Sequence, residues 1–456
     1  MGFDTHQPAD SNSPSANARS PGLTTQQMIA SDRGQLPAAL LREAAPDLGN
    51  DDLSWDRYTT TEFYDLEMRH MWSKTWQWAA RVEQLPNPGD FYVYDIGHYS
   101  VLVVRDSQST IRAFINSCPH RGMQFADSGS QGKGKQFIRC PFHGMSWHLN
   151  GDLRDIPCRW DFPHVDERNF NLSEVGCDIW GGFVFINLDP NASPLMDYLE
   201  VLPDHFAEWP LENRYIVHHT EKILPGNWKM CMEGFLEAYH VLGTHPEAMR
   251  TSAWANTQYD CFSPHVTRFF QVLAGGNPQH EKPISEAELY KALGHTDSLP
   301  DGYSARQAHA AALRTSLGVE MRVDLSGYSD SEMLDSIEYH LFPNACFFPG
   351  INIPLIYRFR PLGVDRCIHD ILMLQPLPEH GTEPESAAKI SLDIDDDYVD
   401  VPTFGPLAYV LDQDTDNFKR QWAGIQASRK GKQTLGIYQE SRIRHFHNTL
   451  DNYLER

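Results

Sequence analysis

Two short cysteine–histidine pairs constrain this chain more than any other sequence feature: C-P-H at residues 118–120 and C-P-F-H at residues 140–143. Two thiolates and two imidazoles on a pair of loops can hold a metal centre. In a [2Fe–2S] cluster of mixed ligation, two cysteines bind one iron and two histidines bind the other. Structural zinc is the alternative, but zinc pairs usually have at least two residues between ligands and seldom mix both residue types on each loop. The pattern therefore predicts a [2Fe–2S] cluster held by Cys118, His120, Cys140 and His143.

The sequences around these ligands carry a family resemblance. CPHRG from residue 118 and CPFHGMSW from residue 140 resemble the Rieske domain of ring-hydroxylating oxygenase large (alpha) subunits. The spacer between the pairs is slightly longer than is usual in that family, and the glycine-containing residues 131–135 are the expected place of the extension. The resemblance extends over roughly residues 55–450. It implies an α+β chain in which a small all-β Rieske domain precedes a larger catalytic domain of antiparallel sheet and helices, of the helix-grip type.

Changes in amino-acid composition and in hydrophobic pattern along the chain predict three segments. Residues 1–50 are expected to be a disordered tail, because the first twenty are rich in Ser, Pro, Asn and Ala. Residues 51–190 are expected to hold an N-terminal helix and the β domain, with short β-like runs at 91–94, 101–104, 111–115 and 182–187. Residues 191–456 are expected to form the catalytic domain, with a polar insertion at 275–335 where a substrate lid would lie.

A second metal site is predicted from the stretch between residues 233 and 246. Glu233, Glu237 and His240 are spaced i, i+4, i+7, so a helix would place them on one face. Gly243 is expected to break that helix and let His245 swing back towards His240. Two histidines beside a carboxylate suggest the facial triad of non-haem Fe(II), which leaves positions open for O2 and substrate. An isolated pair with this spacing would more often have no metal role, but here it accompanies a cluster motif.

The same stretch resembles the iron-binding helix of the oxygenase family. N-W-K at 227–229, followed by E-x-x-x-E-x-Y-H-x-x-x-x-H, implies that His240 and His245 are iron ligands. The third ligand is implied by residues 411–417, which resemble the family's Gln-Asp-x-x-Asn element and match it with Asp414. Asp412 and Asp416 stay open as alternatives, since either could be an ordinary charge at a helix N-terminus.

Glu237 departs from the better-known ring dioxygenases, many of which carry Asp at this place. There the carboxylate bridges a cluster histidine of one subunit to an iron-binding histidine of its neighbour. The resemblance therefore implies that Glu237 is catalytically important and that the chain assembles as a homotrimer. Glu at this place is also familiar from relatives that oxidise quaternary amines such as carnitine or betaines, although Gly234 stands where Asn is expected.

Composition excludes several other classes of protein. A formal net charge of −23 argues against nucleic-acid binding. Neither a membrane-spanning segment nor a signal peptide is expected, and the eight cysteines do not suggest a secreted disulfide framework. A cytoplasmic location is expected. Against this acidic background Arg121, Lys133, Lys135 and Arg139 form a local basic group that could steer an acidic ferredoxin, or could be solvated loop charges.

The resemblance implies the terminal component of a Rieske-type mono- or dioxygenase. A separate NAD(P)H-dependent reductase, with or without a ferredoxin, would supply electrons, because the chain has no flavin or nicotinamide motif. A mostly apolar set of candidate pocket residues favours an aromatic or other hydrophobic substrate, as in aromatic hydrocarbon catabolism; the set is Met232, Phe235, Leu236, Leu242, Phe347 and Phe348. Two alternatives remain, namely hydroxylation or N-demethylation of a quaternary amine, and a Rieske electron carrier without oxygenase activity.

Overall fold

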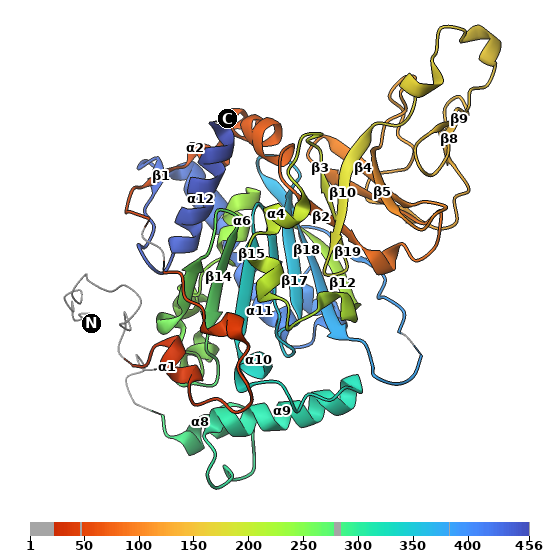
Figure 1. Cartoon of the computed structure of the whole chain (residues 1–456). Coiled ribbons are helices and arrows are strands. Elements are labelled where there is room, and N and C mark those ends of the chain that lie inside the picture. Colours follow the sequence, from red (N-terminus) through yellow and green to blue (C-terminus); the bar gives the residue numbers. More distant parts are fainter. Residues whose placement is uncertain (1–21, 46–47, 278–283, 383, 456) are drawn as a thin grey trace.

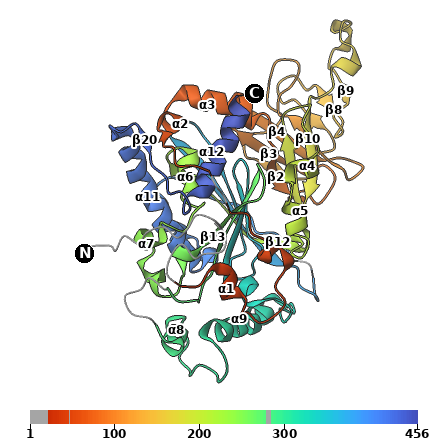
Figure 2. The same cartoon turned by 60° about the vertical axis from the view of Figure 1, so that its left-hand side comes forward.

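The computed structural model describes residues 22–45, 48–277, 284–382 and 384–455 of the chain. Its architecture is α+β, as predicted (Figure 1). A β domain built from residues 77–187 lies beside a large, mostly antiparallel sheet from residues 214–392, and helices pack on that sheet (Figure 2). In the described part of the chain, no helix combines the length and the apolar character needed to cross a membrane.

The β domain contains a seven-stranded sheet and a small three-stranded one. The seven strands run in the order β2-β11-β10-β5-β4-β3-β6, and every neighbouring pair is antiparallel. Their bounds are β2 Gln77–Arg81, β3 Phe91–Ile96, β4 Tyr99–Arg105, β5 Ile111–Ile115, β6 Gln131–Gly132, β10 Glu174–Trp180 and β11 Phe183–Asn187. The three-stranded sheet, β7 Ile138–Arg139, β8 Ser146–Trp147 and β9 Leu153–Asp155, supports the second cysteine–histidine loop.

The second sheet has eight strands in the order β13-β14-β15-β16-β17-β18-β12-β19. Only the pairing of β12 with β19 is parallel among these strands. Their bounds are β12 Arg214–Pro225, β13 Gln258–Cys261, β14 Val266–Gln271, β15 Ser336–Leu341, β16 Ala345–Phe347, β17 Leu355–Pro361, β18 Arg366–Pro376 and β19 Ile390–Leu392. A two-stranded ribbon pairs β1 Leu53–Ser54, which precedes the β domain, with β20 Lys432–Gln433, which lies between α11 and α12.

Short helices connect the strands, and three longer ones lie in the second half. The short ones are α1 Thr25–Ile29, α2 Asp56–Thr59, α3 Thr61–Glu67, α4 Leu195–Leu199, α5 Leu202–His205, α6 Trp228–Glu233, α7 Val241–Thr244, α8 Glu286–Ala292 and α10 Asp330–Leu334. The longer ones are α9 Ala305–Met321, α11 Leu407–Ala427 and α12 Ser441–Leu454. Ser304 starts α9 through a capping box with Gln307, which satisfies backbone N–H groups at the helix start.

Alternation along the strands gives the eight-stranded sheet two different faces. Ile337, Tyr339 and Ile356 belong to a core shared with Trp78 and Phe183 of the β domain. Tyr357 and Phe359 belong instead to a core shared with α6, α11 and α12. Because successive side chains of a strand point to opposite faces, residues 336, 338, 355 and 357 lie on the helix-covered face.

A buried ion pair connects the two parts of the chain. Arg358 on β17 donates from Nε to Asp370 Oδ2 on β18 at 2.8 Å, and both side chains are almost completely buried. The same guanidinium lies 3.5 Å over the Trp78 ring and donates to the Trp78 carbonyl of β2. His219 Nε2 lies 3.0 Å from the other oxygen of Asp370. Asp370 therefore orients a cation that holds the β domain against the second sheet.

The structure corrects two expectations about local structure. The disordered tail was predicted to cover residues 1–50, of which residues 1–21 and 46–47 lie outside the described residues. Residues 22–45 instead contain a helix, α1. This helix starts at a Thr24–Gln27 capping box and buries Ile29. The predicted helix through residue 242 ends at Glu233, with Gly234 as its C-cap. Beyond it the Leu236 carbonyl accepts from Arg442, and the Ala238 N–H donates to Tyr259, so tertiary partners replace the helical bonds.

Candidate metal centres

The two cysteine–histidine loops have the same backbone conformation. In the first, Cys118 N–H donates to Met123 O, and Gly122 N–H donates back to Cys118 O. In the second, Cys140 pairs with Met145, and Gly144 with Cys140, in the same way. Both glycines have φ of +76°, in the left-handed region that glycine adopts without a Cβ penalty. The repeated turn brings the His120 and His143 rings to 4.8 Å between centroids.

The loops bury the thiols and leave the imidazoles towards solvent. Cys118 and Cys140 are buried, His120 is half-buried and His143 is exposed. Burial raises the pKa of Cys118, and the neighbouring Cys140 raises it further, while N–H groups of His120 and Arg121 act in the opposite direction. These N–H groups are placed to donate to a sulfur that carries negative charge. The donor set and the loop geometry thus fit a [2Fe–2S] cluster of mixed ligation.

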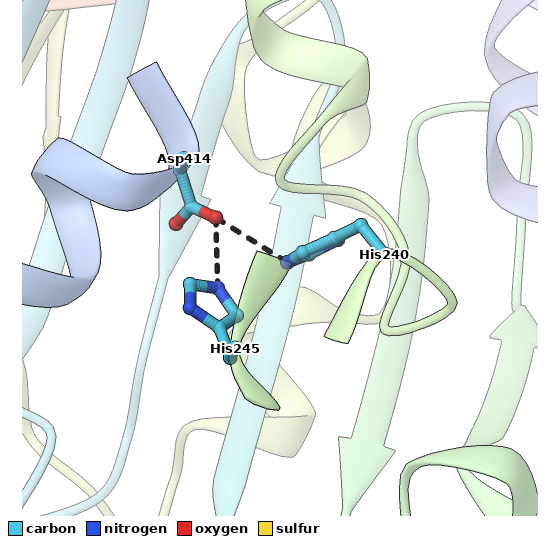
Figure 3. A group of neighbouring side chains, drawn as sticks. All are labelled: His240, His245 and Asp414. Carbon is cyan, nitrogen blue, oxygen red and sulfur yellow. Dashed lines mark ion pairs between the residues drawn. The ribbon is translucent and has the colours of Figure 1, made fainter. Parts of the chain in front are cut away.

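A second cluster of metal-binding groups lies between α7 and α11 (Figure 3). Asp414 Oδ1 lies 2.8 Å from His245 Nε2 and 3.5 Å from His240 Nε2. One ligand atom from each residue falls within 4.8 Å of the others. The two histidines flank the single turn of α7, His240 as its N-cap and His245 as its C-cap. Two imidazoles and one carboxylate meeting on one side fit a facial triad for Fe(II).

Both histidines are held by a second partner through the other ring nitrogen. His240 Nδ1 lies 3.0 Å from Glu237 Oε1, and Glu237 Oε2 accepts from the His240 backbone N–H at 2.9 Å. His245 Nδ1 lies 2.8 Å from Gln413 Oε1. An acceptor at Nδ1 leaves Nε2 free to bind a metal and fixes the ring orientation. The sequence motif had included Gln413 without giving it a role.

The three neighbouring aspartates of α11 have different surroundings. Asp412 accepts the backbone N–H groups of Tyr398 and Val399, and so caps the turn that precedes the helix. Asp416 is exposed, whereas Asp414 is buried beside both histidines. Only Asp414 among the three is thus placed to act as the third ligand.

Glu233 does not belong to this cluster, contrary to the single helical face expected from its spacing. It lies at the end of α6 and accepts from Tyr58 at 2.8 Å, with His447 Nε2 also at 2.8 Å. Gly243, the expected helix breaker, lies inside α7. The helix break at Gly234 rotates Glu237 and His240 away from the direction of Glu233, and a Cβ there would lie 3.0 Å from the Phe418 ring. A larger residue at Gly234 would therefore require the Phe418 ring to shift.

The charges of the second cluster favour a cation. Burial lowers the pKa of His240, but Glu237 and Asp414 outweigh burial and raise the pKa to about 9. Asp414 likewise raises the pKa of His245 against the effect of burial. Both shifts favour the protonated imidazoles when no metal is bound, and a metal must displace such protons to bind.

A mostly apolar cavity of about 270 Å³ opens beside the second cluster. It lies between the helix-covered face of the sheet and the α7 and α11 segments. Phe235 and Phe348 line it as predicted, whereas Phe347 faces the opposite core and Leu242 is exposed. Further wall residues, which sequence periodicity did not identify, are Phe269, Gln271, Leu273, Ser336, Glu338, Ile353, Leu355 and Tyr357 from the sheet side, and Leu407, Val410 and Leu411 from α11.

A third group of possible ligands has another explanation. His219, Glu221 and Asp370 lie within metal-binding reach of one another. Arg360 lies 2.6 Å from Glu221, and Lys389 lies 2.9 Å from its other oxygen. Together with Arg358 at Asp370, these cations already compensate the carboxylates, so this group is an ion-pair network.

Comparison with known proteins identifies the two halves of the chain. Residues 204–456 match the family described as "Ring hydroxylating alpha subunit (catalytic domain)", and residues 75–166 match the "Rieske [2Fe-2S] domain". The carnitine monooxygenase oxygenase subunit of Escherichia coli (strain K12) is 31% identical over 191 residues, which are 41% of this chain and 50% of that relative. This chain therefore spans about half the length of the carnitine monooxygenase subunit that it matches.

Two further similarities cover more of the chain. The large oxygenase component of a 2,4-dinitrotoluene dioxygenase system from Burkholderia sp. (strain RASC) is 23% identical over 384 residues, covering 79% of this chain and 76% of that relative. The solved structure of a quaternary ammonium Rieske monooxygenase has a TM-score of 0.63 at 17% identity, over 90% of this chain and 99% of the other. This structural similarity shows a shared fold.

Proposed function

Since the chain belongs to the family of ring-hydroxylating alpha subunits with a Rieske [2Fe-2S] domain, we propose that it is the terminal oxygenase of a multicomponent system. It would receive electrons from a separate NAD(P)H-dependent reductase, with or without a ferredoxin. Its substrate would be an aromatic or other hydrophobic organic molecule, hydroxylated with oxygen from O2. Aromatic catabolism is the setting that this chemistry favours.

The observation that carries this proposal is the position of the His240, His245 and Asp414 cluster at the edge of an apolar cavity. When bound, a [2Fe–2S] cluster at the first site and Fe(II) at the second would supply electron transfer and O2 activation. Cys118, Cys140, His120 and His143 would hold the former, and the three clustered side chains the latter. The protein's own part is to orient these ligands, bind the substrate and exclude water from the cavity.

Glu237 has a further role in the proposal. Its two oxygens hold the His240 ring and backbone, and an additional lone pair remains for a second imidazole. Figure 2 places α7 and the β8–β9 end of the β domain on opposite sides of the molecule. We therefore propose that Glu237 contacts His143 of a neighbouring subunit, and that a head-to-tail ring of three copies brings the two metal sites together.

The organisation and location of the protein follow the same proposal. Residues 51–190 would form the electron-accepting domain and residues 191–456 the catalytic domain, with residues 1–50 preceding both. The basic side chains at 121, 133, 135 and 139 would face the electron donor; of these, Lys135 packs 4.4 Å over the Phe91 ring. None of the eight cysteines, all of which lie among the described residues, forms a disulfide, which supports a reducing, cytoplasmic location.

A quaternary amine is the second candidate substrate. The carnitine monooxygenase relative and Glu237 in place of Asp favour it. Four aromatic rings in the cavity wall, those of Phe235, Phe269, Phe348 and Tyr357, could surround a trimethylammonium group. A Rieske electron carrier without oxygenase activity is disfavoured, because it would not need the second cluster of ligands.

Metal analysis and oxygen consumption test the proposed function. The purified protein is expected to contain mononuclear iron in addition to a two-iron cluster with visible absorption. With a reductase and NADH, a correct substrate should stimulate O2 uptake and yield a hydroxylated product. Protein with only the two-iron cluster, even after loading with Fe(II), would support the electron carrier instead.

A further inference from the structure

The polar groups of the cavity wall restrict which substrates it can bind. The charged side chains that line it, outside the two iron-site histidines, are Glu237, Glu338 and Asp414. No lysine or arginine belongs to the wall among the described residues. Glu237 and Asp414 are directed at the histidines. Glu338 is the one acidic wall group that is not part of the metal cluster.

Glu338 is placed in the wall by its strand and neutralised from behind. It alternates on β15 with Ile337 and Tyr339, which face the opposite core, so its side chain lies on the cavity face. Arg442 of α12 donates from Nη2 to Glu338 Oε1 at 2.8 Å, and both side chains are almost fully buried. The remaining donors of Arg442 reach Leu236 O and Thr267 Oγ1. The guanidinium therefore has its partners away from the substrate.

Two other polar groups of the wall donate hydrogen bonds to neighbouring side chains. Tyr357 donates its hydroxyl hydrogen to Glu338 Oε2. Gln271 donates from Nε2 to Ser252 Oγ at 2.6 Å. Most of what these groups still offer is acceptor capacity, namely lone pairs on Glu338, on the Tyr357 oxygen and on Gln271 Oε1, beside one remaining N–H of the Gln271 amide. Ser336 adds a hydroxyl that can donate or accept.

We infer that the substrate is a small apolar molecule that bears a hydroxyl or N–H donor and no carboxylate, and that the Glu338–Tyr357 pair binds this donor. A donor meeting that pair gains a hydrogen bond to a charged acceptor in a dry cavity. A substrate carboxylate placed at this pair would instead lose water beside Glu338 without gaining a cationic partner there, since Arg442 is directed at Glu338. This inference rests on the proposed function, and it excludes zwitterions such as carnitine as the preferred ligand.

A matched series of two-ring ligands tests the inference on the iron-loaded protein. We expect 2-naphthol to bind about tenfold or more tightly than naphthalene by calorimetry, because a hydrogen bond to a charged group is worth at least that factor. We expect 2-naphthoate to bind more weakly than naphthalene. Equal binding of 2-naphthol and naphthalene, or tighter binding of 2-naphthoate or L-carnitine than of 2-naphthol, would overturn the inference.

Two substitutions at the Glu338–Tyr357 pair should affect the preference for 2-naphthol over naphthalene differently. Glu338→Gln places an amide donor in the wall, so the advantage of 2-naphthol should fall about tenfold while 2-naphthoate gains. Tyr357→Phe removes the hydroxyl that occupies Glu338 Oε2, so the advantage of 2-naphthol should be kept or increase. The second variant keeps the Glu338–Arg442 pair, and therefore tests the inference even if Glu338→Gln does not fold. Phe348→Leu, a wall change without polar atoms, should weaken 2-naphthol and naphthalene equally.

Oxygen uptake separates this inference from the proposed function. If no ligand stimulates O2 uptake by fully loaded protein with an active reductase, the proposed function fails whatever the order of affinities. If O2 is consumed but the carboxylate is the best substrate, only the inference about Glu338 and Tyr357 fails.

Discussion

Removal of the buried Arg358 guanidinium should strongly lower the free energy of unfolding, because this side chain connects the two parts of the chain. In Arg358→Met, Asp370 would keep His219 at 3.0 Å and Arg360 at 3.9 Å, but would lose the cation that donates two hydrogen bonds to it. Removing one partner of a buried pair costs about 3–5 kcal/mol of unfolding free energy. For a domain of this size that corresponds to a fall in melting temperature of roughly 6–20 °C.

The assay should resolve both the global and the local effect. Calorimetry at pH 7 measures the transition of the second sheet, and hydrogen exchange measures opening of the segment around Trp78 and Ala79, whose carbonyls accept from Arg358. Arg366→Met is the matched control, because Arg366 lies on the same strand as Asp370, is 58% exposed and lies 3.9 Å from Asp365. It should cost less than about 1 kcal/mol.

The double variant Arg358→Met with Asp370→Leu should recover part of the loss, since no unpaired carboxylate would remain buried. Burial alone would raise the pKa of Asp370, but Arg358, His219 and Arg360 outweigh it and lower the pKa. The stabilisation by this pair is therefore complete at neutral pH and is lost only as the pH falls below the ordinary aspartate range. A cost below about 1 kcal/mol for Arg358→Met, with unchanged exchange at Trp78, would refute the reasoning.

Four further predictions concern the proposed metal sites. Cys118→Ser should abolish the visible cluster absorption, whereas Cys158→Ser, at an exposed free thiol, should keep it; an unchanged spectrum of the first variant would contradict the ligand assignment. His245→Ala and Asp414→Ala should each abolish product formation while sparing that absorption; if Asp412→Ala or Asp416→Ala does so instead, the third ligand is misassigned. Gln413→Leu should weaken iron binding about 10–100-fold by freeing the His245 ring, with the exposed Gln426→Leu of the same helix as control; equal iron affinity of both variants would exclude the orienting role. Glu237→Gln should retain both metals and the oligomer but slow cluster reoxidation in rapid mixing with substrate and O2, whereas the exposed Glu247→Gln should not; a normal rate, or a fully active monomeric wild type, would remove the bridge.

Local sequence was sufficient to predict the two loops of the first candidate site, and insufficient to predict the backbone of the second. The loops around Cys118 and Cys140 depend on neighbouring glycines and prolines, so a short motif specifies them. The end of the helix that follows Asn227 depends on distant residues. Arg442 donates to the backbone carbonyl of residue 236, and Tyr259 accepts from the backbone N–H of residue 238. No periodicity within the segment could reveal these contacts. The pairing of His240 with His245 was predicted correctly, but for the wrong reason, because Gly243 does not break α7.

The choice among the aspartates and the cavity residues required tertiary information. Asp412, Asp414 and Asp416 have similar local sequence, and they differ through what packs on α11: the turn at Tyr398, the histidines, or solvent. Phe347 and Phe348 are adjacent apolar residues, and strand alternation sends only the second to the cavity. Gln413 could have been suspected, since it precedes Asp414 in the motif.

The single helix α11 also has an evolutionary consequence. One rigid rod carries Asp414, its neighbour Gln413, and three side chains of the cavity wall at positions 407, 410 and 411. Each residue advances a helix by about 100°, so a one-residue insertion between positions 411 and 413 would turn Gln413 and Asp414 away from the wall side chains that precede them. Replacement of one wall side chain would leave the other groups in place. Selection can therefore change what this chain accepts by point substitution on α11, while insertions and deletions there are penalised through the loss of the whole arrangement.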